Sequence, residues 1–225
     1  MVISPVAYYH SVLKEKFGTP RQSGLIPGLK GTVKLCEGFG PEMLEGLDDF
    51  DYIWLIWGFN LNRDGARTPA KVRPPRLGGN AKTGVFATRS PYRPNPVGLS
   101  SVRLESIDHA DGLLHVLGAD LVDETPIFDI KPYLEYSDSH SGIRNGFTDT
   151  VEWRKLNIEW DGKALEAGLT QAQREELAAL LSLDPRPAYQ NDPDRGYGLS
   201  YDGWNIRFRV EGKTLIVESA ARQRA

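Results

Sequence analysis

The sequence predicts a mainly β protein, in which an N-terminal antiparallel β-barrel is followed by a small α+β C-terminal domain. Two observations predict this fold class. Short apolar or alternating runs separated by turn residues fill the first two thirds of the chain, and the composition changes after residue 153, where an amphipathic helix pattern appears. At about 150 residues per domain, 225 residues fit one large domain and a smaller one. We therefore expect the barrel in residues 1–153 and the α+β domain in residues 154–225.

The first expected strands lie in the first ninety residues. Residues 31–36 alternate between apolar and polar, as in a strand with one buried face. Residues 52–59 form a continuous apolar run of the length of a buried strand. Residues 85–88 are a further, short strand candidate.

A long hairpin and one more strand complete the expected barrel. Residues 97–107 read as a long strand whose apolar positions change phase between Leu99 and Val102, which predicts a β-bulge there. Residues 113–117 follow across Asp111-Gly112, a dipeptide typical of tight hairpin turns. Residues 127–134 add the last strand. Many short strands with few helices favour a barrel.

The C-terminal part begins with the clearest helix signal in the chain. Thr170 and Gln173 have the spacing of a capping box, and leucines at 177, 180 and 181 form one apolar helix face that stops before Asp184-Pro185. Residues 204–210 then alternate between apolar and polar, and a tight turn at residues 211–213 leads into a second strand. Helix and hairpin together predict the α+β domain.

Composition limits the chemistry. With 40% hydrophobic and 25% charged residues, the chain has the composition of a folded soluble protein. The single cysteine, Cys36, excludes an internal disulfide and a thiolate metal cluster, and the four histidines lack metal-ligand spacing, so we expect no metal. No apolar run reaches the length of a membrane span and the first residues do not resemble a signal peptide, so we expect a cytoplasmic protein with no membrane contact.

Positive charge is concentrated in one segment. Residues 63–93 contain eight basic residues and one acidic residue, whereas the whole chain has a net charge of -3. Such a segment attracts phosphate groups. The alternative is a solvated basic loop with no partner.

Several enzyme signatures are absent. The sequence has no Gly-x-Ser-x-Gly elbow and no Walker lysine motif. Gly38-Phe39-Gly40 begins a dinucleotide-binding pattern, but Met43 stands where the third glycine is needed, so we interpret it as a turn.

Three loop-like patches stand out instead. Residues 73–80 and 88–98 are rich in proline, glycine and arginine, and such rigid loops lose little entropy when their arginines bind an anion. Residues 118–126 place carboxylates between two expected strands, where they could bind an ammonium group or ribose hydroxyls. The alternatives are rigid connectors for the first two patches and turn-capping carboxylates for the third.

These patches carry a resemblance to a known family. The strings RPPRLGGNAKTGVFATRSPYRPNPVGLS (73–100), PRQSGL (20–25), DLVDETPIFDIKPY (120–133) and DPRPAY (184–189) closely resemble the YaeB/TrmO (TsaA-like) family of tRNA (N6-threonylcarbamoyladenosine) methyltransferases. The resemblance spans both expected domains. It implies a β-barrel that binds S-adenosyl-L-methionine, a homodimer with small C-terminal domains, and a tRNA anticodon loop as substrate.

The resemblance also implies a set of site residues. The implied cofactor-binding residues are Gln22, Ser23, Gly24, Asn60, Leu61, Arg89, Leu99, Asp120, Leu121, Val122, Asp123 and Thr125. The residues expected to contact tRNA are Arg67, Lys71, Arg76, Tyr92, Arg93 and Arg186, with Tyr92 stacking on a base or packing within its loop.

The implied reaction needs no covalent nucleophile, because a sulfonium methyl group is already activated and the protein has chiefly to align donor and acceptor. Loss of the proton on the acceptor nitrogen would assist transfer. Asp123 and Asp129 are the candidate catalytic bases. The alternatives are that Asp123 only binds the cofactor, that Asp129 only supports a turn, and that solvent takes the proton. The competing function is a non-catalytic barrel that binds RNA or S-adenosylmethionine as an accessory protein.

Overall fold

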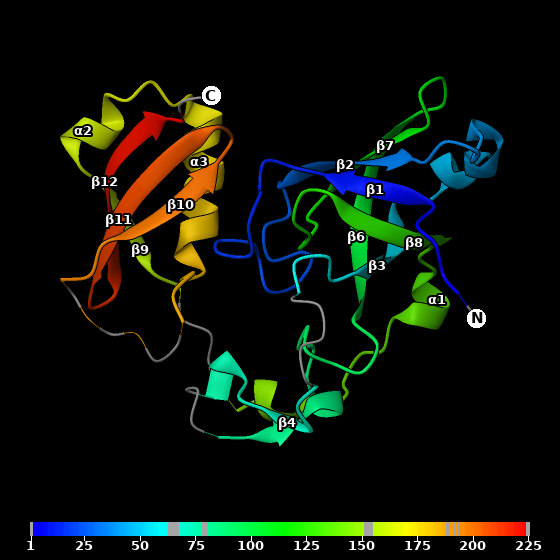
Figure 1. Cartoon of the computed structure of the whole chain (residues 1–225), viewed down its shortest axis with the longest axis horizontal. Coiled ribbons are helices and arrows are strands. Elements are labelled where there is room, and N and C mark those ends of the chain that lie inside the picture. Colours follow the sequence, from blue (N-terminus) through cyan, green and yellow to red (C-terminus); the bar gives the residue numbers. More distant parts are fainter. Residues whose placement is uncertain are drawn as a thin grey trace.

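The computed structural model describes residues 2–62, 68–77, 81–150, 155–187, 190, 192 and 194–223. Two lobes are visible in Figure 1: a β-barrel, and a four-stranded sheet covered by helix α3. Each lobe has its own cluster of buried apolar side chains. The predicted fold class, mainly β with a barrel and a small α+β part, is confirmed.

The barrel is a closed sheet of six antiparallel strands in the order β1-β2-β7-β6-β3-β8. Their bounds are β1 Ala7–His10, β2 Lys30–Leu35, β3 Tyr52–Gly58, β6 Val97–Asp108, β7 Leu113–Leu117 and β8 Thr125–Pro132. The sequence predicted every one of these strands except β1. Strand β1 is only four residues long and closes the barrel by pairing with β2 on one side and β8 on the other.

Side chains of alternating strand positions fill the barrel. Ile53, Leu55 and Trp57 of β3 point inward and are buried, as are Leu114 and Val116 of β7. The intervening apolar residues of β3 lie half-buried on the outer face, so its continuous apolar run does not mark a strand buried on both sides.

The β-bulge predicted between Leu99 and Val102 of strand β6 is wrong. Its even-numbered residues from Gly98 to Leu104 face inward without interruption, whereas Val97 and Leu99 face outward and are exposed. The pairing irregularity with β7 lies between Leu104 and Ser106 instead. The phase change in the sequence was misleading because the inward positions 98 and 100 hold small residues and the outward positions hold apolar ones.

The short strand predicted at residues 85–88 is also wrong. Val85–Ala87 form a 3-10 helix, η4, in which the N–H of Thr88 donates to the Val85 carbonyl. Only Val85 of this run is buried, while Phe86 is exposed. The run therefore packs through a single apolar side chain and has no buried face of alternating residues, as a strand would. The Gly38-Phe39 segment is a turn as predicted, with Gly38 at φ +92° and the Phe39 N–H donating to the Cys36 carbonyl.

Helix α3 (Gln171–Ser182) begins with the predicted capping box between Thr170 and Gln173 and buries its leucine face. It covers a sheet of order β10-β11-β12-β9, made of β10 Tyr197–Tyr201, β11 Trp204–Glu211, β12 Thr214–Arg222 and β9 Asn157–Trp160. The predicted hairpin is β11–β12. The sequence predicted neither β10 nor β9, and β9 pairs parallel to β12.

The hydrophobic cluster of the C-terminal lobe includes residues from the N-terminal part of the chain. Leu13, Ile26 and Leu29, from the long connection between β1 and β2, are buried among the side chains of α3 and β10–β12. Figure 1 shows this connection extending from the barrel toward the C-terminal sheet. The predicted boundary at residue 153 lies outside the described residues.

The remaining elements are short. They are η1 Pro41–Leu44, η2 Leu47–Asp49, β4 Lys71–Val72, η3 Pro75–Leu77, β5 Thr83–Gly84, α1 Glu135–Asp138, η5 Gly146–Thr148 and α2 Gly162–Leu165. Among the described residues, no helix has the length and apolar character to cross a membrane.

The close approach of Gly98 to Trp57 gives a test of barrel packing. A Cβ at Gly98 would overlap the indole ring of Trp57, which is buried inside the barrel. Gly98→Ala should therefore lower the free energy of unfolding by about 1–3 kcal/mol, measured by urea denaturation. Gly84→Ala is the control, because a Cβ there meets no atom within 4 Å. Equal stability of the two variants would contradict this packing.

Candidate active site at the loop end of the barrel

Three connections meet at one end of the barrel, and strand pairing is the reason. Because all neighbours are antiparallel, β1, β3 and β7 end where β2, β6 and β8 begin. The connections 11–29, 59–96 and 118–124 therefore leave the barrel at the same end. They contain nearly all of the residues that the sequence analysis singled out for binding, including Gln22–Gly24, Asn60, Arg89 and the carboxylates of 120–123.

Hydrogen bonds join these three connections. Arg89 donates to the side-chain oxygen of Gln22, and the Gly24 N–H donates to the Gly118 carbonyl at 2.8 Å. The side-chain amide of Asn60 donates to the Glu124 carbonyl at 2.9 Å. The predicted cofactor residues of three separate sequence patches thus lie together.

Asp120 is a half-buried carboxylate at this end of the barrel. The Ser100 hydroxyl donates to its Oδ1 at 2.5 Å, and Trp57 Nε1 donates to the Ser100 oxygen at 3.0 Å. Burial raises the pKa of Asp120, and the hydrogen bond from Ser100, the nearby Arg89 charge and the Ser23 N–H partly oppose that rise. Asp120 thus brings a carboxylate close to Arg89 and to the Ser23 backbone.

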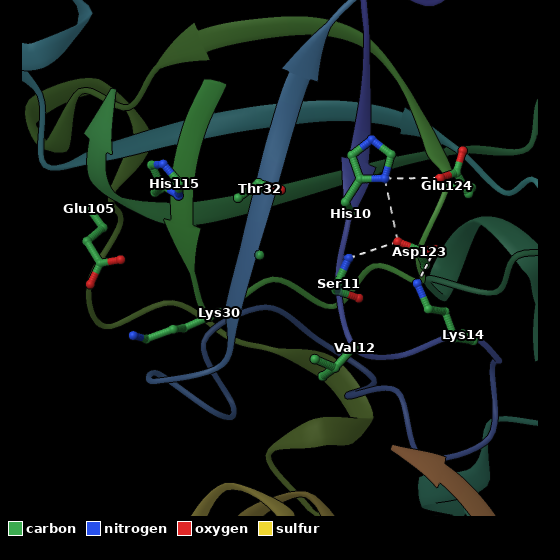
Figure 2. Close-up of a pocket in the computed structure, with 11 residues that line it drawn as sticks. His10, Ser11, Val12, Lys14, Lys30, Thr32, Glu105, His115, Asp123 and Glu124 are labelled. Carbon is green, nitrogen blue, oxygen red and sulfur yellow. Dashed lines mark hydrogen bonds and ion pairs between the residues drawn. The ribbon is translucent and has the colours of Figure 1, made fainter. Parts of the chain in front are cut away.

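Asp123 is held by a different set of groups, shown in Figure 2. Its Oδ1 accepts from the Ser11 N–H at 3.0 Å, and its Oδ2 accepts from Lys14 Nζ at 2.5 Å. His10 Nδ1 lies 3.0 Å from Glu124 Oε1 and 3.6 Å from Asp123 Oδ1. Burial acts to raise the pKa of Asp123, but the bonds from Lys14 and Ser11 outweigh it and hold that pKa below its usual value.

His10 is a residue of this site that the sequence did not predict. Because Tyr9 pairs with Thr125 across β1 and β8, His10 lies beside Glu124, and no spacing in the sequence signals that contact. His10, Asp123 and Glu124 offer ligand atoms within 4.8 Å of one another, an arrangement that could hold a divalent cation. In this structure, however, the Lys14 ammonium already pairs with the Asp123 carboxylate.

An open groove of about 540 Å³ adjoins these side chains, and Lys30 and His115 also line it.

The other predicted cofactor residues are of two kinds. Leu121, Val122 and Thr125 are buried, and the Thr125 hydroxyl donates to the Val122 carbonyl at 2.7 Å, so they shape the loop from within. Leu99 and Leu61 are exposed by 57% and 44%, which leaves apolar surface beside the polar groups.

Asp129 lies apart from the loop end. It sits on β8 opposite Ile56, on the outer face of the barrel, and pairs with Lys131 at 2.8 Å. The structure therefore does not bring the two candidate bases, Asp123 and Asp129, together.

The predicted tRNA contacts are scattered. Tyr92 is 49% exposed, with Lys16 Nζ 5.8 Å from its ring centre, and Arg93 donates to the Thr88 carbonyl at 3.1 Å. Lys71 is exposed on β4. Arg67 and the side chain of Arg76 lie outside the described residues. Arg186 is buried in the C-terminal lobe and pairs with Asp184, so its guanidinium is engaged within the protein.

The fold and these loops define a β-barrel protein with a polar loop end as its candidate binding site, and the described elements contain no doubly wound parallel sheet of the Rossmann type. Residues 8–139 match the family described as the tRNA-methyltransferase O N-terminal domain, and residues 153–223 match the TrmO C-terminal domain. The chain belongs to the TrmO family.

Relatives extend over nearly the full length. A Pseudomonas aeruginosa protein named as an S-adenosylmethionine-dependent methyltransferase is 42% identical over 222 residues, covering 95% of this chain and 94% of its own. The tRNA (adenine(37)-N6)-methyltransferase of Escherichia coli is 37% identical over 215 residues, or 91% of each chain. A crystal structure of TrmO from Pseudomonas aeruginosa superposes with a TM-score of 0.78 at 32% identity and covers 98% of both chains.

The raised pKa of Asp120 predicts a pH-dependent stability difference. The native state binds the Asp120 proton more tightly than the unfolded chain, so this carboxylate lowers stability as pH rises above 3.8 and through its raised native pKa. Asp120→Asn removes that loss. Relative to the wild type, the variant should gain stability with increasing pH, measured by denaturant unfolding between about pH 3.5 and 7.5. Asp111→Asn, at an exposed turn position, is the control. A difference that is constant with pH, or of the opposite sign, would contradict the assignment.

Proposed function

We propose that the protein is an S-adenosylmethionine-dependent methyltransferase that methylates N6 of the adenosine at position 37 of tRNA, beside the anticodon. The observation that carries this function is the joining of the Gln22–Gly24, Arg89 and Asp120 segments at one barrel end, in a chain that matches both TrmO domains. Residues 1–153 form the catalytic barrel in this proposal, and residues 154–225 form the small C-terminal domain.

The donor groups at the loop end fit this cofactor. S-adenosylmethionine, when bound, supplies a methyl group activated by a sulfonium charge. Arg89 offers a cation for a carboxylate, and Asp120 and Asp123 offer anions for an ammonium group or ribose hydroxyls. Leu61 and Leu99 offer exposed apolar surface for a ring or a methylene chain. The remaining proposed cofactor residues are Gln22, Ser23, Gly24, Asn60, Leu121, Val122 and Thr125, which present backbone groups or fix the loops.

The residues of this chain act mainly by holding and orienting. Asp123 binds Lys14 and the Ser11 N–H, and its lowered pKa makes it a weak proton acceptor, so its surroundings favour a positioning role over that of a base. Asp129 could accept a proton only from a group on the outer face of the barrel, where Lys131 pairs with it. Asp123 and Asp129 as bases stay predictions.

The substrate in this proposal is adenosine that already carries the threonylcarbamoyl group. Acylation makes the exocyclic N–H more acidic, and the threonyl carboxylate gives Arg76 or Arg93 an anion to bind. Contacts from Lys71, Arg67 and Tyr92 would add phosphate binding and stacking along the anticodon loop. Arg186 belongs to the predicted tRNA set as well, although Asp184 occupies its guanidinium.

The protein is proposed to act in the cytoplasm as a homodimer. Support for a dimer comes from the outer face of β3 and β6, where Tyr52, Val97 and Leu99 are apolar and exposed. A second copy covering this face would also cover Leu99, one of the proposed cofactor residues.

The function is tested by incubating the purified protein with labelled S-adenosylmethionine and total tRNA, followed by mass spectrometry of the nucleosides. Label in an N6-methylated adenosine at position 37 supports the enzyme. Tight binding of cofactor or RNA without turnover would instead support the accessory-protein alternative.

Arg89 should contribute directly to cofactor affinity. Arg89→Ala removes a charged hydrogen-bond donor from the joined loops and should weaken S-adenosylmethionine binding by about 1–3 kcal/mol, measured by calorimetry. Arg207→Ala is the matched control, because Arg207 is an exposed arginine on β11 of the C-terminal lobe, opposite Gly198 of β10. Unchanged affinity in a folded Arg89→Ala protein would remove Arg89 from the site.

The enzyme should discriminate against tRNA that lacks the threonylcarbamoyl group. A site built to bind the threonyl carboxylate leaves its arginines unpaired with bare adenosine, so the methylation rate should fall by about two orders of magnitude or more. The comparison is between native tRNA and its unmodified transcript. Equal rates would point to a general adenosine methyltransferase.

A further inference from the structure

The connection that contains Gln22, Ser23 and Gly24 is anchored in the C-terminal lobe. Leu13, Ile26 and Leu29 belong to this connection, on either side of residues 22–24, and are buried in the hydrophobic cluster of that lobe. Phe17 stacks on Tyr197 with ring centres 6.4 Å apart. The Ser200 N–H donates to the Glu15 carboxylate at 3.1 Å. The position of this connection therefore depends on the C-terminal lobe as well as on the barrel.

Hydrogen bonds of Arg21 connect the C-terminal lobe with Gln22, one of the proposed cofactor residues. Arg21 Nη2 donates to the carbonyl oxygens of Asp184 and Arg186, each at 3.2 Å. The carbonyl of Arg21 accepts from Gln22 Nε2 at 2.5 Å, and the other atom of that amide, Oε1, accepts from Arg89. The Arg21 side chain thus ties residue 21 to the loop after α3, and the backbone carbonyl of the same residue is joined through the Gln22 amide to Arg89.

Asp184 and Arg186 fix the two carbonyls that Arg21 binds. Arg186 Nε and Nη2 donate to the two oxygens of Asp184 at 2.8 and 2.9 Å, a bidentate pair whose geometry is specific. Asp184 has a left-handed backbone conformation, φ 52°, directly after the C-cap of α3. The Arg186 side chain is only 10% exposed. The pair is therefore a rigid support built into the C-terminal lobe.

We infer that the C-terminal domain positions the cofactor-binding residues of the barrel through Arg21, and that the Asp184–Arg186 pair is the support for this contact. The inference rests on the proposed function, in which Gln22 and Arg89 bind the cofactor. Arg21 is a positioning residue, because its side chain fixes the backbone of residue 21, whose carbonyl holds the Gln22 amide. The loop of residues 184–187, the DPRP loop, then supports cofactor affinity without touching the cofactor and is not a tRNA contact.

The test compares cofactor binding by full-length variants. Arg21→Ala should weaken S-adenosylmethionine binding between about twofold and tenfold, the range for one ordinary hydrogen bond, because Arg21 affects the cofactor residues only indirectly; thermal unfolding should change little. Arg21→Lys should restore part of the affinity. Arg174→Ala should have no effect, because Arg174 bonds only to Leu165 and Gln171 of its own lobe in the hydrogen bonds described.

A double-mutant cycle tests whether Arg21 acts through Arg89. Arg21→Ala combined with Arg89→Ala should lose little more affinity than Arg89→Ala alone, because the residues lie on one series of contacts. Additive losses would overturn the inference. Asp184→Asn gives an independent variant, which should weaken cofactor binding and be non-additive with Arg21→Ala.

The experimental outcomes distinguish a failure of this inference from a failure of the proposed function. Failure of the wild type to bind S-adenosylmethionine would overturn the proposed function and this inference together. Wild-type binding with unchanged affinity in Arg21→Ala and Asp184→Asn would overturn the inference alone. Loss of tRNA affinity in these variants without loss of cofactor affinity would also overturn it, because the DPRP loop would then be a tRNA contact.

Discussion

Pairing of the short strand β1 with both β2 and β8 closes the sheet, and the site depends on that closure. A closed antiparallel barrel has no free edge, so every connection must leave at one of its two ends. With six strands in alternating direction, the connections 11–29, 59–96 and 118–124 share one end. Residues far apart in the sequence, such as Gln22, Arg89 and Asp120, become neighbours for this reason.

The loop end carries two carboxylates, Asp120 and Asp123, whose surroundings differ. Asp120 is half-buried next to the inward-facing Ser100 and Trp57, where partial burial disfavours its charged form. Asp123 has the opposite balance, because Lys14 and the Ser11 N–H stabilise its carboxylate. Two carboxylates three residues apart thus differ in proton affinity, and the difference comes from the partners that the tertiary fold supplies.

The long connection between β1 and β2 belongs to both lobes. Its apolar residues Leu13, Ile26 and Leu29 complete the C-terminal cluster, while its residues 22–24 bond to the barrel loops. Movement of the C-terminal lobe would therefore shift Gln22 relative to Arg89. Separating the lobes by cutting the chain near residue 153 would leave the C-terminal cluster without part of its core.

The sequence by itself determined the fold class, five of the six barrel strands, helix α3 and the β11–β12 hairpin, because alternation, turn dipeptides and the Thr170 capping box are local signals. It also singled out the loops that meet at the barrel end. It predicted a bulge at the wrong place in β6, because small residues occupy inward positions there. It also predicted a strand at residues 85–88, where only Val85 is buried. Strands β1 and β9 are too short to give a pattern.

Only the tertiary structure decided which residues meet at and around the candidate site. The cross-strand pairing that sets His10 beside Glu124, the outward position of Asp129 and the Asp184–Arg186 pair that supports Arg21 are all contacts between distant segments. Local sequence carries no information about such contacts, because strand register and the packing of one lobe on another depend on the whole chain.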